Sequence, residues 1–288
     1  MTVEAVTERG LHMEYYRLRD GLQLPKVGFG TYKLNGTNGV RAIESAINQG
    51  YRLIDTAYNY ENEGTVGAAI RGAGVPRSEL LVTSKLPGRY YHRAAAIDAL
   101  KESLYRAGLD YFDLYLLHWP NPRKDLYVEA WQALIDAQQF GLVRSIGVCN
   151  FLPDYLDRLD RETGVLPVVN QIELHPHFNQ ADQRAYDEAH GILTEDWSPL
   201  GRASDVLQNP AIKAVAAAHN KGVGQVILRW AVQLGTLPIP KSQHASRQRE
   251  NLDIFDFNLS DDEMATINAL STPDGRLKNQ DPSKYEEF

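Results

Sequence analysis

Four polar side chains of types suited to proton transfer stand where three successive apolar segments end. Asp55 and Tyr60 follow one segment, Lys85 lies near the end of the next, and His118 ends the third. A carboxylate, a phenol, an ammonium and an imidazole at one place suit the protonation of an oxygen while a hydride arrives at the adjacent carbon.

Tyr60 is the expected proton donor of this set. A phenol has a pKa of about 10, so on its own it is a poor acid near neutral pH. An ammonium nearby stabilises the phenolate, so we expect Lys85 to lower the pKa of Tyr60 and make it a better general acid. Lys85 stands among apolar residues and needs a counter-ion, for which Asp55 is the natural candidate. We expect His118 to hydrogen-bond a carbonyl oxygen and orient it.

Each of the four residues also has an ordinary structural explanation when it is taken alone. A lone Asp at a strand end is usually a helix cap or turn former, and a lone Tyr is usually an amphipathic boundary residue. A lone Lys is usually solvated, and a His before Trp-Pro can be purely structural. The combination of all four favours the functional interpretation.

The chain that must position these four residues alternates between apolar segments of strand length and segments of helix length. The expected strands are Lys26–Gly30, Leu53–Ala57, Leu80–Leu86, Phe112–His118, Val143–Asn150, Val168–Leu174, Ile192–Ser198 and Leu237–Lys241. The expected helices are Gly39–Gln49, Glu61–Gly72, Arg93–Ala107, Leu126–Phe140, Pro153–Glu162, Gln180–His190, Pro210–Lys221, Gly224–Leu234 and Ser246–Phe255. Near-continuous apolar strands are typical of a sheet covered on both faces. The pattern predicts an α/β protein, a (β/α)8 TIM barrel, whose active site lies at the carboxyl ends of the strands.

Segments at both ends extend the expected barrel, which covers residues 26–255. Asp20-Gly21 between two short alternating runs predicts an N-terminal β-hairpin over about 13–24. Ser260 with three following acidic residues predicts the start of a last helix. The polar tail that ends the chain is either a loop across the barrel mouth or a frayed end. We expect residues 1–288 to form one domain.

Composition narrows the class of protein. Thirty Lys and Arg residues against 37 Asp and Glu residues give a formal net charge of −7, which argues against a general nucleic-acid binder. A single cysteine forms no internal disulfide, no stretch is long and apolar enough to span a membrane, and no signal peptide is visible. We therefore expect a cytoplasmic protein, a monomer, with a small molecule as its partner and neither nucleic acid nor membrane.

Three motifs give the chain a specific resemblance. They are Gly50–Ala57 (GYRLIDTA) followed by Glu63 and Gly67; Arg144–Phe151 (RSIGVCNF); and Ile239–Ser242 (IPKS) followed by Arg247, Glu250 and Asn251. In this order, and at the expected strands, they resemble the aldo-keto reductase family. The resemblance runs from Val27 to about Leu270 and is closest to the bacterial short-loop reductases that include 2,5-diketo-D-gluconic acid reductase.

The resemblance implies an NADPH-dependent reduction of aldehydes and ketones, possible substrates being α-dicarbonyls or keto-sugars. It places Asp55, Tyr60, Lys85 and His118 in a catalytic tetrad with Tyr60 as general acid. The implied cofactor contacts are Gly30, Thr31, Tyr32, Asp55, Cys149, Asn150, Gln171, Trp197, Ser198, Leu200, Gly201, Lys241, Ser242, Arg247, Glu250 and Asn251. The implied substrate contacts are Tyr32, Tyr60, His118 and Trp119, together with the C-terminal tail.

Individual roles within the implied cofactor site follow by position. Asn150 and Gln171 match the residues that hold the nicotinamide carboxamide, and Trp197 matches the aromatic residue on which the nicotinamide ring stacks. Lys241 and Arg247 suit the 2′-phosphate of NADP, because guanidinium and ammonium groups bind phosphate well. The ordinary explanation of this last cluster is a solvated basic turn before a helix.

The chain departs from the family pattern at two positions. Cys149 stands where many relatives have Ser, and we expect it to be inert packing. Asp196 precedes Trp197, where a small residue is common, and it either alters cofactor affinity or pairs with Arg202. The segment Gly201–Asn209 is too short for the clamp that some relatives fold over the cofactor, which predicts fast cofactor release.

Three other interpretations are weaker. Gly28-Phe29-Gly30 is not a dinucleotide fingerprint, because position 33 is Lys and no helix follows at once. His175 and His177 lack a third ligand nearby, so a structural turn is favoured over a metal pair, and we expect no metal. A non-catalytic, cofactor-sensing subunit of a larger assembly remains the alternative to an enzyme, although the intact tetrad argues against it.

Overall fold

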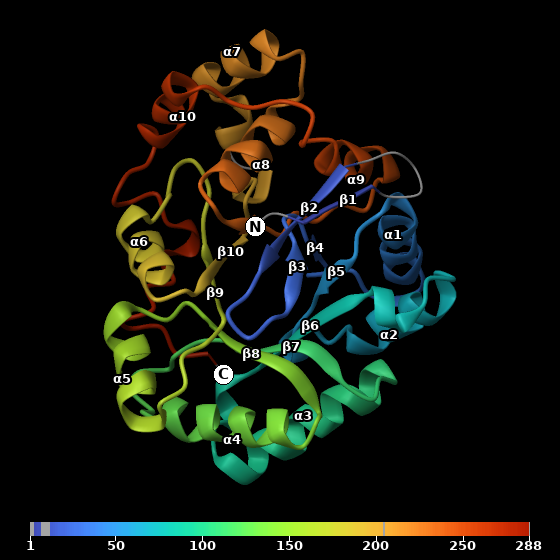
Figure 1. The fold of residues 1–288 in the computed structure, drawn as a ribbon, viewed down its shortest axis with the longest axis vertical. Helices are drawn as coiled ribbons and strands as arrows, with labels where there is room; N and C mark the ends of the chain where they lie inside the picture. The colour runs from blue at the N-terminus through green and yellow to red at the C-terminus, as the bar shows by residue number, and fades with distance from the viewer. Residues whose placement is uncertain (1–2, 7–11, 204, 288) are drawn as a thin grey trace.

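A computed structural model of the chain describes residues 3–6, 12–203 and 205–287. The described residues contain a sheet of eight parallel strands in the order β11-β10-β9-β8-β7-β6-β5-β4. The strands are β4 (Phe29–Gly30), β5 (Leu53–Asp55), β6 (Leu81–Leu86), β7 (Phe112–Leu117), β8 (Val143–Cys149), β9 (Val169–Glu173), β10 (Leu193–Trp197) and β11 (Leu237–Pro238). Figure 1 shows the helices arranged around these strands, which confirms the expected (β/α)8 architecture.

Backbone hydrogen bonds between the first and last strands close the sheet on itself. The N–H of Gly28 donates to the oxygen of Pro238, and the N–H of Gly30 donates to the oxygen of Pro240, both at 3.0 Å. Pro238 and Pro240 have no N–H with which to donate a hydrogen bond back to the first strand. The ladder between the two strands is therefore incomplete, and β4 and β11 are shorter than the expected strands Lys26–Gly30 and Leu237–Lys241. A Cβ at Gly30 would stand 3.3 Å from the Ile239 oxygen, so glycine allows the close approach of the two strands.

The helices follow the strands in the expected order. They are α1 (Gly36–Gln49), α2 (Glu63–Gly72), α3 (Arg93–Ala107), α4 (Tyr127–Gln139), α5 (Pro153–Thr163), α6 (Ala181–Ala189), α7 (Pro210–Ala218), α8 (Val223–Gln233), α9 (Ala245–Leu252) and α10 (Asp261–Asn268). Both α7 and α8 precede β11, and α10 begins with the expected capping box between Ser260 and Glu263. Within the described residues, no helix has the length and apolar character needed to cross a membrane.

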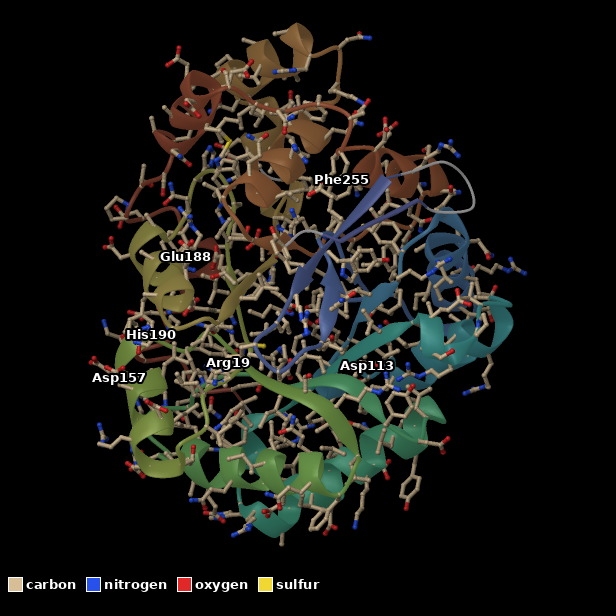
Figure 2. The ribbon with its side chains drawn as sticks, in the orientation of Figure 1. Arg19, Asp113, Asp157, Glu188, His190 and Phe255 are labelled. Carbon is tan, nitrogen blue, oxygen red and sulfur yellow. The ribbon has the colours of Figure 1, made fainter. Side chains whose placement is uncertain are left out.

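The N-terminal hairpin closes the end of the barrel opposite the candidate site. It pairs β2 (His12–Arg17) with β3 (Gln23–Pro25), as expected, and β1 (Val3–Val6) adds an unexpected third strand. Arg19 donates to the Leu166 oxygen at 2.7 Å, and the hydroxyl of Tyr16 donates to the Thr236 oxygen at 3.0 Å. Leu166 and Thr236 precede β9 and β11, so the hairpin lies at the amino ends of the strands. Figure 2 shows Arg19 on the side of α6, where Glu188 and His190 are labelled.

Candidate active site

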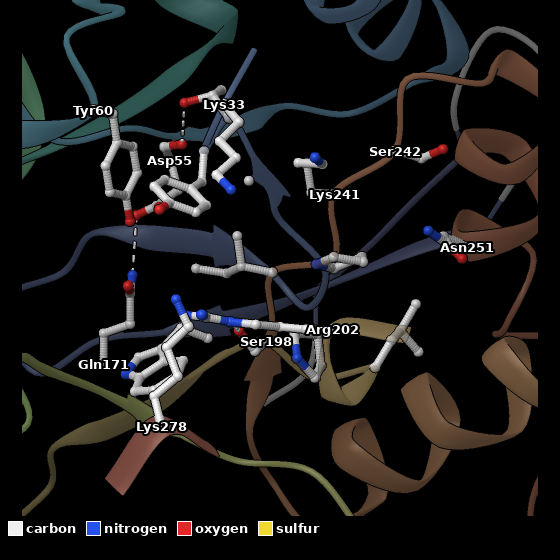
Figure 3. A pocket seen from close by; sticks show the side chains of 18 of the residues that line it. Lys33, Asp55, Tyr60, Gln171, Ser198, Arg202, Lys241, Ser242, Asn251 and Lys278 are labelled. Atoms are coloured by element: carbon white, nitrogen blue, oxygen red, sulfur yellow. Dashed lines mark hydrogen bonds between the residues drawn. The ribbon is translucent and has the colours of Figure 1, made fainter. Parts of the chain in front are cut away.

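A cavity of about 1380 Å³ lies at the carboxyl ends of the barrel strands. All the predicted site residues line it except Lys85 and Gly201. Lys85 is fully buried behind the wall, and Gly201 turns the chain with a φ of 58°. The implied contacts of Lys85 and Gly201 with a bound molecule stay predictions. Figure 3 shows Asp55, Tyr60 and Gln171 towards one end of the cavity and Lys241, Ser242 and Asn251 towards the other.

Lys85 and Asp55 form the buried ion pair that the sequence predicts. Nζ of Lys85 donates to Oδ1 of Asp55 at 2.7 Å, to Oδ2 at 2.8 Å and to the Thr56 oxygen at 2.8 Å. All three ammonium hydrogens are thereby used. Burial lowers the pKa of Lys85, but the carboxylate of Asp55 and further contacts outweigh burial, so the pKa lies above its usual value. The lysine stays charged beside the cavity.

Tyr60 lies at the end of a short 3-10 helix (Tyr58–Tyr60), directly above this ion pair. Nζ of Lys85 is 5.0 Å from the centre of the Tyr60 ring. Burial raises the pKa of Tyr60 to about 12, although Lys85 acts to lower it. Lys85 lowers the pKa as expected, but the cost of burying a phenolate exceeds the benefit of the ammonium, so the net shift is upward. Tyr60 therefore keeps its proton near neutral pH and is available as a donor.

His118, the fourth residue of the tetrad, lies beside Tyr60. The two ring centres are 5.9 Å apart in an edge-on arrangement. Nδ1 of His118 is 2.6 Å from Oε1 of Glu287, a close polar contact without ideal hydrogen-bond geometry. Sequence reasoning did not find Glu287, because no local pattern places a residue of the tail beside β7.

The C-terminal tail crosses the mouth of the barrel, which is one of the two paths the sequence left open. The ring of Tyr285, a residue of this tail, packs on the ring of Trp119, and the two ring centres are 4.4 Å apart. Lys278, Gln280, Tyr285 and Glu287 all line the cavity. The tail is thus part of the wall that a substrate would meet.

Gln171 lies deeper in the barrel and connects two carboxyl groups. Its Nε2 donates to Oδ2 of Asp55 and to Oε2 of Glu195, each at 3.0 Å. Burial raises the pKa of Glu195 to about 8, and the negative charge of Asp55 adds to this effect. Because both amide hydrogens are used inside the barrel, only the oxygen of Gln171 is left to bind another molecule.

Trp197 and Asn150 hold each other against the cavity. Nε1 of Trp197 donates to Oδ1 of Asn150 at 2.8 Å, and Nδ2 of Asn150 lies 3.3 Å from the His118 oxygen, to which it donates. Asn150 adopts a φ of 61°, a left-handed conformation that Asn tolerates better than most residues. The indole ring of Trp197 is therefore held in a fixed orientation at the cavity wall.

The two departures from the family pattern have structural explanations. Asp196 follows Glu195 on β10 and so points to the opposite face of the strand. It accepts a hydrogen bond from Thr236 at 2.6 Å, while Arg202 donates to Ser198, so the considered pairing with Arg202 is absent.

Burial raises the pKa of the Cys149 thiol well above its usual value, which keeps it protonated and suits the expected packing role.

The far end of the cavity is formed by the segment after β11 and by α9. Lys241 and Arg247 are exposed, and neither forms an ion pair with any residue that the structure describes. Ser242 is buried, and its oxygen accepts from the N–H of His244 at 3.1 Å. Glu250 and Asn251 also line this end. The cationic side chains therefore lie within reach of an anionic ligand.

Many lining residues have no sequence signal of their own. Besides the tail, the residues that sequence reasoning missed are Lys33, Asn59, Pro199, Arg202, Asp205, Leu207, Gln208, Val223, Gly224, Ile239, Pro240, Gln243 and His244. Six of these thirteen residues are direct neighbours in sequence of predicted residues, and that proximity is a signal that could have found them: Lys33, Asn59, Pro199, Arg202, Pro240 and Gln243.

The two loop histidines lie in a tight turn, as favoured by the sequence. The N–H of Phe178 donates to the His175 oxygen at 2.8 Å, and Nε2 of His175 lies 3.0 Å from Oε1 of Glu173. No group of three or more metal-ligating side chains occurs among the described residues.

Comparison with known proteins agrees with this fold and site. Residues 26–272 match the model of the Aldo/keto reductase family. The chain is 51% identical over 271 residues to 2,5-diketo-D-gluconic acid reductase B of Corynebacterium sp. (94% of this chain, 97% of the relative). It is 44% identical to methylglyoxal reductase DkgA of Salmonella typhimurium (93% and 97%). A solved structure of a Gox0644 mutant in complex with NADPH is 38% identical, with a TM-score of 0.90 over 94% of this chain and 98% of that chain.

The chain belongs to the aldo/keto reductase family. The resemblance inferred from three motifs and the assignment to an enzyme class, the oxidoreductases of this family, are confirmed.

Proposed function

We propose that this protein uses NADPH to reduce aldehydes and ketones to alcohols, with α-dicarbonyls and keto-sugars among the candidate substrates. The observation that carries the proposal is the buried Lys85–Asp55 ion pair directly beside Tyr60, with His118 facing the same cavity. The reductase names of the relatives and the NADPH complex of a neighbour support the same reaction class.

The described residues fit the cofactor at both ends of the cavity. Lys241 and Arg247 offer two cations with no ion pair among the described residues, which suits a 2′-phosphate. Trp197 presents a fixed aromatic face for stacking, and Asn150 and Gln171 lie beside it for the carboxamide. NADPH, when bound, supplies the hydride.

The tetrad performs the proton-transfer half of the proposed reaction. As hydride adds to the carbonyl carbon, the carbon–oxygen double bond becomes single and the oxygen takes the proton from the hydroxyl of Tyr60. Lys85 stabilises the phenolate that this leaves, and Asp55 keeps Lys85 charged and in place. His118 hydrogen-bonds the carbonyl oxygen and orients it. Solvent then returns a proton to Tyr60.

The catalytic proposal and the cofactor-sensing alternative differ in one observable. An enzyme consumes NADPH when a reactive carbonyl is present, whereas a sensing subunit binds NADPH without consuming it. A panel of aldehydes, α-dicarbonyls and keto-sugars ranked by kcat/KM tests the enzyme and identifies its substrate class. The single barrel domain over 1–288, the monomeric state and the cytoplasmic location stay predictions.

Arg247→Ala tests the phosphate end of the proposed cofactor site. We expect the Kd of NADPH to rise by about tenfold, the scale of one lost hydrogen bond to a charged group, with little change for NADH. The change in intrinsic fluorescence on titration with each cofactor measures both values. Arg249→Ala is the matched control, because Arg249 lies on the same helix but outside the cavity. Equal weakening of NADPH and NADH would contradict the assignment of the 2′-phosphate to Arg247.

The short segment after β10 predicts fast release of the cofactor. It forms two 3-10 turns, Gly201–Ala203 and Asp205–Gln208, beside the cavity. A long closing loop often limits turnover, and this segment is too short to be one. Stopped-flow fluorescence should show NADPH binding in a single fast phase with a release rate above kcat. A slow second phase would indicate trapping and contradict the prediction.

A further inference from the structure

The end of the described chain is fixed beside the tetrad. Glu287 is buried, although it lies one residue from the C-terminus, and 169 positions separate it from His118 in sequence. Ring packing between Tyr285 and Trp119 holds the segment just before it. Glu286 accepts a hydrogen bond from the N–H of Arg123 at 2.7 Å. The tail is therefore anchored to the segment that follows His118.

A reciprocal pair of hydrogen bonds fixes the backbone of Glu287. Nδ2 of Asn121 donates to the Glu287 oxygen at 3.0 Å, and the N–H of Glu287 donates to Oδ1 of Asn121 at 2.8 Å. Gly88 leaves the space that these two hydrogen bonds need, because a Cβ at this position would stand 1.6 Å from Nδ2 of Asn121. The position of residue 287 is thus set by its hydrogen bonds with Asn121 and by the space that Gly88 leaves for them.

The carboxylate of Glu287 is directed at His118. Its Oε1 lies 2.6 Å from Nδ1 of His118 and accepts from Nδ2 of Asn59 at 2.7 Å, while Oε2 accepts from the N–H of Gly88 at 3.2 Å. Burial raises the pKa of Glu287, but the charge of His118 and these hydrogen bonds outweigh burial and hold the pKa below its usual value. The carboxylate is therefore ionised near neutral pH and has hydrogen-bond donors in Asn59 and Gly88, while its close contact with Nδ1 of His118 lacks hydrogen-bond geometry.

We propose that Glu287 is a positioning residue for His118: its carboxylate keeps the hydrogen on Nδ1 and fixes the ring so that Nε2 meets the carbonyl oxygen. A carboxylate next to one imidazole nitrogen selects the form protonated there. Nδ1 then faces Glu287, and Nε2 donates to the carbonyl oxygen when it carries a hydrogen of its own, as both ring nitrogens do in the doubly protonated imidazole. This proposal rests on the proposed reduction, in which His118 orients the substrate.

The test compares Glu287→Gln and Glu287→Ala with Glu286→Gln in the full-length protein. The neighbouring Glu286 shares the tail and the charge but contacts the Arg123 backbone instead of His118, so it is the matched control. We expect Glu287→Gln to lower kcat/KM by about tenfold and Glu287→Ala by more, the scale for partners that orient a functional histidine. The Kd of NADPH and the unfolding temperature of Glu287→Gln should stay close to the parent values.

A spectroscopic readout separates positioning from a merely structural role. Nitrogen NMR of protein labelled at histidine, with His118 assigned by its loss in His118→Asn, should show Nδ1 protonated in the parent protein and in Glu286→Gln. Nδ1 should lose this protonated signal in Glu287→Ala. An unprotonated Nδ1 in the parent protein, or parent-like spectra and kcat/KM in both Glu287 variants, would overturn the proposal. If the parent protein reduces no carbonyl, the proposed function fails, whereas the NMR comparison still decides the role of Glu287.

Discussion

Tyr60→Phe is expected to lower kcat by about 100-fold or more, the scale of a lost general acid, while the Kd of NADPH stays the same. The substitution removes only the hydroxyl, and the ring can keep its packing against His118 and Lys85. Without the hydroxyl, the developing alkoxide has no side-chain proton donor of comparable position. Steady-state rates with a saturating aldehyde, together with fluorescence titration of NADPH, measure both quantities.

Tyr58→Phe is the matched control for this prediction. Tyr58 lies on the same short helix as Tyr60, but its hydroxyl accepts a hydrogen bond from Arg106 and does not line the cavity. Its kcat should stay within about twofold of the parent value, as expected for a residue outside the reaction. A Tyr60→Phe variant with near-normal turnover would remove Tyr60 from the mechanism.

Lys85→Met is expected to cost about 3–5 kcal/mol in the free energy of unfolding, the range for breaking a buried ion pair from one side. The variant leaves the Asp55 carboxylate, 3% exposed, without its ammonium and close to a second buried carboxyl at Glu195. The Nε2 group of Gln171 alone does not compensate that charge. Urea unfolding followed by circular dichroism measures the loss.

A double-mutant cycle distinguishes the ion pair from a simple packing defect. Asp55→Asn combined with Lys85→Met removes both charges, so the double variant should be clearly more stable than the sum of the single effects predicts. Additive losses would show that the two side chains are not energetically coupled. Activity should be lost in Lys85→Met and in the double variant, because no ammonium stabilises the Tyr60 phenolate, and lowered in Asp55→Asn, because Lys85 loses the carboxylate that holds it in place.

Much of the site can be predicted from the sequence, because the end of each strand can be located locally and the barrel then brings the strand ends together. Each of Asp55, Lys85 and His118 stands at the end of an apolar segment, and parallel strands place all such ends on one side of a barrel. The Lys85–Asp55 pair follows from elementary electrostatics, since a lysine among apolar residues requires a partner. The two shortened strands were not predicted, although Pro238 and Pro240 were there to indicate them.

Other features depend on long-range geometry that no local pattern contains. Glu287 reaches His118 only because Asn121, Gly88 and the tail meet in space. Lys85 acts on the pKa of Tyr60 in the predicted direction, but the sequence does not show how deeply the phenol is buried, and burial reverses the net shift. The pairing of Asp196 with Arg202 that the sequence left open gives way to a hydrogen bond from Thr236 on the opposite face of the strand.

The most direct test of the central claim is the stoichiometry of NADPH consumption with a reactive α-dicarbonyl. The absorbance of NADPH should fall in proportion to the alcohol formed, with one hydride transferred for each carbonyl reduced, and the rate should depend on the hydroxyl of Tyr60. Tight binding of NADPH with no consumption across aldehydes, dicarbonyls and keto-sugars would contradict the account and favour a cofactor-sensing subunit.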